Sequence, residues 1–256
     1  MIKACIFDLG GTIIDKYSLT PLLSLKQTFS RRDITLNQTR LLNDNWMDKQ
    51  AHMLKLLNDT NVLNQWLKRY MDYPDEYDVK ILFNDFYQNQ HEYLKNDIEI
   101  IPETRECISY LRFNYIKTGS MSEHNQTNTE LIQNQFEREK IYMDSYVSSC
   151  QKNHKRKEIQ MIHQNITNMG IRYPQEVMKI DDNVSGIKEG HNAGCITVGV
   201  AKWSVHMNIL NSYKIDETER QEKLKRTRGL LKDAGADHVI DSLDELPRLI
   251  EKINYK

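Results

Sequence analysis

Residues 2–12, I-K-A-C-I-F-D-L-G-G-T, determine how the rest of the sequence is interpreted. An apolar run ends at Phe7, Asp8 follows, and two glycines come shortly after. An apolar strand that leads into a glycine turn is typical of α/β proteins, which present polar side chains at the carboxyl ends of parallel strands. The stretch therefore predicts a buried first strand with Asp8 at the edge of a sheet.

Beyond residue 100, strand and helix signals alternate regularly. Strands are expected at 115–121, 145–149, 177–180, 195–200 and 238–240. Helices are expected near 103–112, 127–139, 156–169, 184–193, 216–234 and 243–253. Repeated β-α units imply a parallel sheet with right-handed crossovers.

Residues 19–96 differ from the rest of the chain in composition and pattern. Glycine is absent from this segment, and apolar residues recur at helical spacing. The aromatic residues of this segment are expected to pack in its core. We therefore predict an α/β protein with a Rossmann-like parallel sheet core, formed by residues 1–17 and 100–256. A helical cap domain, residues 18–99, is inserted after the first strand.

Composition excludes several classes of protein. The chain has 256 residues, 39% of them hydrophobic, and a formal net charge of −1, so no bulk field favours nucleic acid or an anionic membrane. None of the four cysteines belongs to a C-x-x-C pair, and a disulfide framework is not expected. No run approaches the ~18 apolar residues of a membrane span. The sequence thus predicts a cytoplasmic protein that binds neither nucleic acid nor membrane.

Polar side chains follow several of the expected strands. Asp8 follows the first strand, Ser122 the second, and Asp181 and Asp182 the fourth. Carboxyl ends of parallel strands lie at one edge of a sheet, so these groups are expected to converge. Three acids and a hydroxyl suit Mg²⁺ and a phosphate group, since the cation offsets the anionic charge.

These residues resemble the motifs of the haloacid dehalogenase (HAD) superfamily. The segment F-D-L-G-G-T, residues 7–12, resembles its first motif, and the Asp181-Asp182 pair resembles its acidic fourth motif. Ser122 matches the hydroxyl of the second motif, and Arg156 the cation of the third. Order and spacing agree over nearly the whole chain.

The resemblance implies a hydrolase in which Asp8 attacks phosphorus. It implies that Mg²⁺ is held by Asp8, Asp182 and the Gly10 carbonyl, with Asp181 nearby. Ser122 and Arg156 would bind the transferring phosphoryl group, with Gly11 and Thr12 in the same loop as Asp8. The cap would close over the sheet edge and exclude water, and the enzyme would be a homodimer joined through its caps.

Gly10 narrows the resemblance to one branch. Most phosphatases of the superfamily carry a second aspartate at this position, which protonates the leaving alkoxide, and a glycine cannot do so. The phosphonatase (phosphonoacetaldehyde hydrolase) family dispenses with that acid. Residues 119–122, G-S-M-S, and 182–194, D-N-V-S-G-I-K-E-G-H-N-A-G, are similar to its motifs. Residues 49–52, K-Q-A-H, fit its K-x-x-H pattern.

In that family the lysine, here Lys49, forms a Schiff base with the substrate aldehyde. The chemistry explains the need: C–P cleavage expels a carbanion, and a protonated imine accepts its electrons as an enamine. The attacking lysine must be neutral. His52 lies three residues on, on the same helical face, and is placed to shuttle the proton. The expected products are acetaldehyde and phosphate.

The match departs from the family pattern at several positions. The family has a Met-Gly pair shortly before the lysine, where this sequence reads N-W-M-D at residues 45–48, and Asp48 adjoins Lys49. Glu123 replaces a glycine after the second motif, and Gly186 replaces the second acid of the fourth motif, for which Asp181 is a substitute. The segment 154–157, H-K-R-K, lacks the expected glycine and proline.

Two alternatives therefore stay open. One is a phosphonatase-like hydrolase acting on another small phosphorylated or phosphonylated compound, with Lys49 idle. The other is a binding or regulatory protein that keeps the fold without turnover. Individual residues also have structural interpretations: Lys49 and His52 as ordinary helix residues, Ser122 as a partner of backbone groups, Arg156 as part of a solvated helix start, and Asp182 as a helix N-cap.

Overall fold

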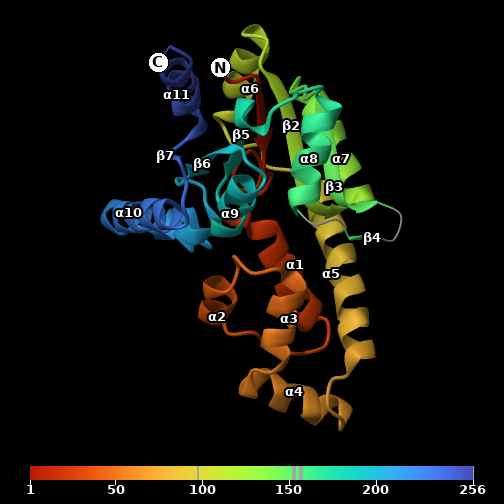
Figure 1. Cartoon of the computed structure of the whole chain (residues 1–256). Coiled ribbons are helices and arrows are strands. Elements are labelled where there is room, and N and C mark those ends of the chain that lie inside the picture. Colours follow the sequence, from red (N-terminus) through yellow and green to blue (C-terminus); the bar gives the residue numbers. More distant parts are fainter. Residues whose placement is uncertain (97, 152–153, 156–157, 256) are drawn as a thin grey trace. The chain divides into compact units, whose positions relative to one another are not determined.

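The computed structural model describes residues 1–96, 98–151, 154–155 and 158–255. The chain divides into two compact units. The first comprises Met1–Tyr17 and Ile98–Lys256, and the second comprises Ser18–Asp97. Figure 1 draws both units, coloured along the sequence.

A seven-stranded sheet forms the centre of the first unit, in the order β4-β3-β2-β1-β5-β6-β7. All neighbouring strands are parallel except β3 and β4. The strands are β1 (Ala4–Phe7), β2 (Lys117–Asn125), β3 (Ser145–Gln151), β4 (His154–Lys155), β5 (Val177–Asp181), β6 (Ile196–Val200) and β7 (His238–Ile240). Strand order reverses on the two sides of β1, and α/β proteins form their sites at the carboxyl end of such a point.

Helices cover this sheet (Figure 1). They are α6 (Thr104–Phe113), α7 (Gln126–Arg138), α8 (Glu158–Asn168), α9 (Val184–Asn192), α10 (Glu217–Asp233) and α11 (Leu246–Asn254). Helix α8 contacts β2, β3 and α9, and α9 contacts β5 and β6. Ala4 and Ile6 of β1 point into a core cluster that includes Ile162 and Ile166 of α8, because alternate residues of a strand share a face.

The second unit is entirely helical within the described residues. Its helices are α1 (Leu19–Ser30), α2 (Gln38–Asn43), α3 (Lys49–Leu57), α4 (Thr60–Tyr70) and α5 (Glu76–Asn96). Helix α1 packs along α5, and α3 contacts α4 and α5. The apolar stripe of α5 is core, since Val79, Leu82 and Phe86 are buried. Asn37, Asp48 and Asp59 cap the starts of α2, α3 and α4 with their side chains.

The predicted α/β class with a parallel sheet is confirmed, with three local corrections. Strand β2 continues to Asn125, so Ser122 lies inside the strand rather than after it. A shift of register between Ser122 and Asn125 makes this extension irregular. The short antiparallel β4 was not expected, and β6 begins at Ile196, one residue after Cys195.

Cys5, Cys107 and Cys195 are buried and free. Among the described helices, none combines the length and the apolar character that a membrane crossing requires.

Candidate active site

Strand register brings the acidic residues together. Phe7 of β1 stands opposite Ile180 of β5, so Asp8 and Asp181 follow at the same level of adjacent strands. The Asp8 N–H donates to the Ile180 carbonyl at 2.9 Å. Each of Asp8, Asp181 and Asp182 offers a carboxylate oxygen, and these oxygens lie within 4.8 Å of one another. Asp181 and Asp182 are buried, with exposed fractions of 4% and 2%.

The loop after β1 is built around Asp182. The Leu9 carbonyl accepts hydrogen bonds from the N–H groups of Thr12, Ile13 and Ile14 at 3.0–3.3 Å, which winds the loop into a tight turn. Gly11 has a φ of +71°, and a Cβ there would stand 2.4 Å from Oδ2 of Asp182. Only glycine fits that position without displacing the carboxylate. Thr12 is fully buried, and its Oγ1 lies 3.5 Å from Oδ1 of Asp182.

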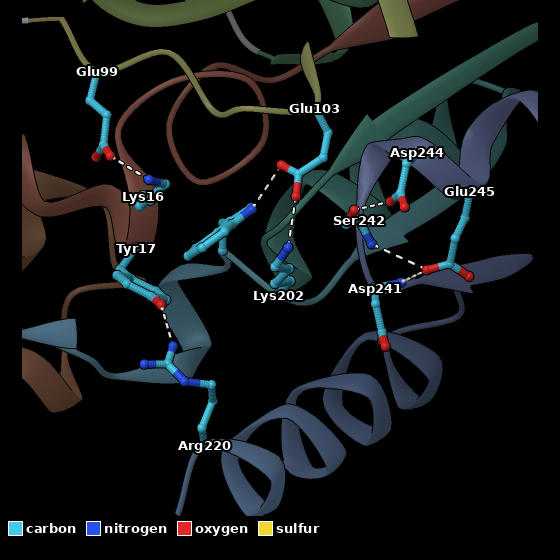
Figure 2. Close-up of polar contacts among 11 residues, drawn as sticks. Lys16, Tyr17, Glu99, Glu103, Lys202, Arg220, Asp241, Ser242, Asp244 and Glu245 are labelled. Atoms are coloured by element: carbon cyan, nitrogen blue, oxygen red, sulfur yellow. Dashed lines mark hydrogen bonds and ion pairs between the residues drawn. The ribbon is translucent and has the colours of Figure 1, made fainter. Parts of the chain in front are cut away.

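The loop after β6 holds Asp182 from the other side. The Val205 N–H donates to Oδ2 of Asp182 at 2.7 Å, and the Ser204 hydroxyl donates to its carbonyl, also at 2.7 Å. This loop is anchored in turn by Glu103, which accepts from Lys202 Nζ at 2.7 Å (Figure 2). Glu103 also accepts from Trp203 Nε1 at 3.1 Å. Asp182 is therefore held in place by the backbone of a braced loop.

Asp181 pairs with a lysine that sequence reasoning missed. Lys179 of β5 is fully buried, and its ammonium forms an ion pair with Oδ2 of Asp181. The other oxygen, Oδ1, accepts from the Asn183 N–H at 2.9 Å. Burial opposes charge on Lys179, but the charges of Asp181 and Asp8 raise the pKa of Lys179 above its ordinary value. Lys179 therefore offsets part of the negative charge of the acidic cluster.

Two glycines of α9 make room for this ion pair. A Cβ at Gly186 would stand 2.0 Å from Oδ2 of Asp181, and a Cβ at Gly190 would stand 2.8 Å from Cγ of Lys179. Positions four apart lie on one helix face. Gly186, where the resemblance expected an acid, thus leaves its space to the carboxylate of Asp181.

The cluster carries an electrostatic cost of its own. Burial and the nearby charge of Asp181 raise the pKa of Asp182 well above its ordinary value. Burying like charges together disfavours the ionised forms unless a cation compensates. The oxygen-rich donor set and its excess negative charge fit a hard divalent cation.

Of the two phosphate-binding candidates, Ser122 lies among the residues that the structure describes. Ser122 is buried, with 3% of its surface exposed, and its Oγ accepts from the His124 N–H at 3.0 Å. Register places it near the carboxyl end of β1, because Phe7 stands opposite Ser120. Arg156 lies outside the described residues.

Lys49 and His52 lie on α3 in the helical unit. Lys49 is the first residue of this helix, and its Nζ donates to the carbonyl and side-chain oxygens of Asn45 and to the Met47 carbonyl. Asp48 accepts the Ala51 N–H at 3.0 Å as the N-cap. His52 is fully buried, and neither of its ring nitrogens has a hydrogen-bond partner in the described part of the chain. Burial, with the charge of Lys49, lowers the pKa of His52 to about 4.

A haloacid dehalogenase-like hydrolase family model matches residues 2–194. The chain is a haloacid dehalogenase-like hydrolase. Its phosphonatase-like branch is shown by its relatives. A phosphonoacetaldehyde hydrolase of Latilactobacillus sakei is 30% identical over 98% of this chain and 96% of its own length. Another phosphonoacetaldehyde hydrolase, from Syntrophobacter fumaroxidans, is 28% identical over 99% of this chain and 92% of its own length.

A solved structure has the same fold as this hydrolase. It is the crystal structure of a phosphonoacetaldehyde hydrolase-like protein from Oleispira antarctica, with a TM-score of 0.88 and 24% identity. The similarity covers 99% of this chain and 93% of the other.

The hydrolase brings together the residues predicted for the sheet edge, namely Asp8, Gly11, Thr12, Asp181 and Asp182. Lys49 and His52 are neighbours on their own helix. Sequence reasoning missed Lys179 and the loop 201–207. One signal existed for the lysine: β5 reads V-M-K-I-D, and a charged residue inside a buried strand requires a partner.

Proposed function

We propose that this hydrolase cleaves the C–P bond of phosphonoacetaldehyde, giving acetaldehyde and phosphate. The observation that carries the proposal is the position of Lys49 on α3, three residues before the buried His52, whose ring nitrogens have no hydrogen-bond partner among the described residues. Gly10 supports it, because a glycine cannot protonate the leaving group of a phosphate ester. The relatives named phosphonoacetaldehyde hydrolase match this chain over nearly its whole length, which supports the same substrate.

The acidic cluster would hold Mg²⁺ in this proposal. Asp8, Asp182 and the Gly10 carbonyl are the proposed ligands, with Asp181 beside them as the partner of Lys179. When bound, Mg²⁺ offsets the charge of the carboxylates and of the phosphoryl oxygens.

The first chemical step is imine formation by Lys49. Its amine, held by the oxygens of Asn45 and Met47, releases them, loses a proton and adds to the aldehyde carbon. Loss of one water gives the imine, whose protonated form is an electron sink. His52 is the proposed proton carrier, because it lies three residues from Lys49 on the same face of α3.

The second step is attack by Asp8 on phosphorus. A bond forms between its carboxylate oxygen and phosphorus, and the C–P bond breaks. The electron pair of that bond moves through carbon to the iminium nitrogen and leaves an enamine. We propose that Ser122 and Arg156, with the loop of Gly11 and Thr12, bind the phosphoryl group during this transfer.

Two hydrolyses close the cycle. Water attacks the aspartyl phosphate and releases phosphate from Asp8. The enamine takes a proton on carbon, and the resulting iminium is hydrolysed to acetaldehyde and free Lys49. One water is released at imine formation and two are consumed in these hydrolyses. The overall reaction therefore consumes one phosphonoacetaldehyde and one water, and gives one acetaldehyde and one phosphate.

The second unit is the proposed cap, and the proposed homodimer would form through it. Tyr70, Met71, Tyr73 and Tyr77 expose apolar surface there, which supports an interface.

The test is product release from phosphonoacetaldehyde in the presence of Mg²⁺. Phosphate and acetaldehyde should appear in equal amounts, and an aryl phosphate such as p-nitrophenyl phosphate should turn over far more slowly. Rapid hydrolysis of aryl and sugar phosphates, without acetaldehyde from the phosphonate, would overturn the proposal.

One observation favours a second candidate. Three oxygen acceptors around the Lys49 amine also suit a lysine that only stabilises the start of α3. In that case the enzyme is a hydrolase of another small phosphorylated or phosphonylated compound. The same panel of substrates distinguishes the two.

A further inference from the structure

Asn45 is a buried residue that contacts both the lysine amine and the start of the helical unit. Only 4% of its surface is exposed. Its Oδ1 accepts from Lys49 Nζ at 3.2 Å, and its backbone carbonyl accepts from the same amine. Its Nδ2 donates to the Ser18 carbonyl at 3.2 Å. One carboxamide thus uses its oxygen on Lys49 and its NH₂ group on Ser18.

Ser18 occupies a restricted position. It is the first residue of the helical unit and precedes α1, with a left-handed backbone at φ 51° and ψ 50°. A non-glycine residue in that region is strained and persists only where its surroundings fix it. The bond from Asn45 is one contact that fixes this carbonyl.

We infer that Asn45 is a positioning residue for Lys49. Through its carboxamide, it holds the Lys49 amine in a fixed position relative to the backbone of Ser18, where the chain enters the helical unit. The inference rests on the proposed imine chemistry, in which the location of the amine decides whether it meets the aldehyde. Small displacements of a reacting group cost about a hundredfold in rate. Asn45 would act through Lys49 and need not touch the substrate.

The neutral charge of Asn45 fits this role. Two acidic residues lie nearby in sequence: Asp44 forms an ion pair with Lys55 at 2.6 Å, and Asp48 caps α3 through the Ala51 N–H. His52 is neutral near pH 7 because its pKa is lowered. The Asn45 oxygen therefore orients the amine without adding a full negative charge beside it.

The isosteric change Asn45→Asp tests this assignment. It would place a carboxylate about where Oδ1 now lies, 3.2 Å from the amine, and an opposite charge that close favours the charged amine by roughly 1–3 pH units. We expect the pH dependence of Lys49 acetylation by trace acetic anhydride, followed by mass spectrometry, to shift upward by about one unit or more. The pH profile of kcat should shift in the same direction.

A second variant covers the case in which Asn45→Asp does not fold. Asn45→Ala removes one acceptor without adding charge, and acetylation of Lys49 should become faster relative to exposed Lys26 of α1. The matched control is Asn89→Ala, because Asn89 is also a buried asparagine of the helical unit and its Nδ2 donates to Thr28 Oγ1 at 3.0 Å. It should lower the melting temperature while leaving both labelling measurements as in the wild type.

The outcomes separate this inference from the reaction it rests on. If borohydride traps no imine on the wild-type enzyme with phosphonoacetaldehyde, the proposed reaction fails, and the inference fails with it. If the imine is trapped while Asn45→Asp or Asn45→Ala labels Lys49 as the wild type does, only the inference is overturned.

Discussion

Asp8 directly follows β1, and its carboxylate lies among the acids that are proposed to hold Mg²⁺. Asp8→Asn keeps the shape of the side chain and removes both the attacking charge and a metal ligand. We expect kcat/KM to fall by several orders of magnitude while circular dichroism and the melting temperature stay close to those of the wild type. A variant that keeps more than a few per cent of the turnover would remove Asp8 from the mechanism.

The space beside Gly186 gives a second prediction for a single residue. Gly186→Ala would drive a methyl group into the carboxylate of Asp181, which must then leave its place beside Lys179. We expect a lower melting temperature and weaker Mg²⁺ binding by titration calorimetry. Gly229→Ala in α10 is the matched control, since nothing lies within 4 Å of its Cβ. It should stabilise the protein by up to about 1 kcal/mol, and equal effects of the two changes would contradict this account.

The positions of some site residues could be predicted from the sequence, and the positions of others could not. Asp8 and Asp182 follow apolar strands, so strand order alone predicts that they meet. The pairing of Lys179 with Asp181 depends on the space above two glycines of α9, and this is a fact of packing. The sequence shows that Asp48 adjoins Lys49, but that the Asp48 carboxylate accepts the Ala51 N–H as the cap of α3 is a fact of the local structure.

Helix α3 carries a pH dependence through His52. The pKa of His52 is lowered to about 4 by burial, against an unfolded value near 6.5. Between these values the unfolded chain binds the proton more tightly, so stability rises with pH through this window and is lost as pH falls. Above about pH 6.5 this contribution is complete.

The variant that checks this sign is His52→Met. Replacing the imidazole by an apolar side chain should lower the slope of unfolding free energy against pH, between pH 4 and 6.5, by at most about 1.4 kcal/mol per unit. Urea unfolding at several pH values measures it. An unchanged slope would mean that His52 is not buried in its neutral form.

At the scale of elements, periodicity predicted most of the architecture. Buried faces leave a direct pattern in the sequence. This pattern is an apolar run in β1, β5 and β6 and helical spacing of apolar residues in α5. The irregular end of β2 and the short β4 depend on pairing between strands. Residues 117–125 are polar at their end, so the pattern predicted a loop where hydrogen bonds to β3 continue the strand.

For the whole molecule, the acidic cluster predicts coupling between metal binding and folding. A cation that binds only the native state stabilises it by mass action, by about 2.7 kcal/mol at a concentration 100 times Kd. We expect Mg²⁺ to raise the melting temperature by several degrees, EDTA to reverse this and abolish turnover, and Asp182→Ala to remove the effect. Asp181→Ala should weaken it less. Turnover that is unaffected by EDTA would contradict the metal assignment.

The central claim is that Lys49 forms an imine during C–P cleavage, and borohydride trapping tests it most directly. Borohydride added with phosphonoacetaldehyde should inactivate the enzyme, and peptide mass spectrometry should find the reduced adduct on Lys49. Lys49→Arg should keep the charge, lose the adduct and lose C–P cleavage, because a guanidinium does not form the imine under these conditions. An active wild-type enzyme that is insensitive to borohydride, or full cleavage by Lys49→Arg, would contradict the account.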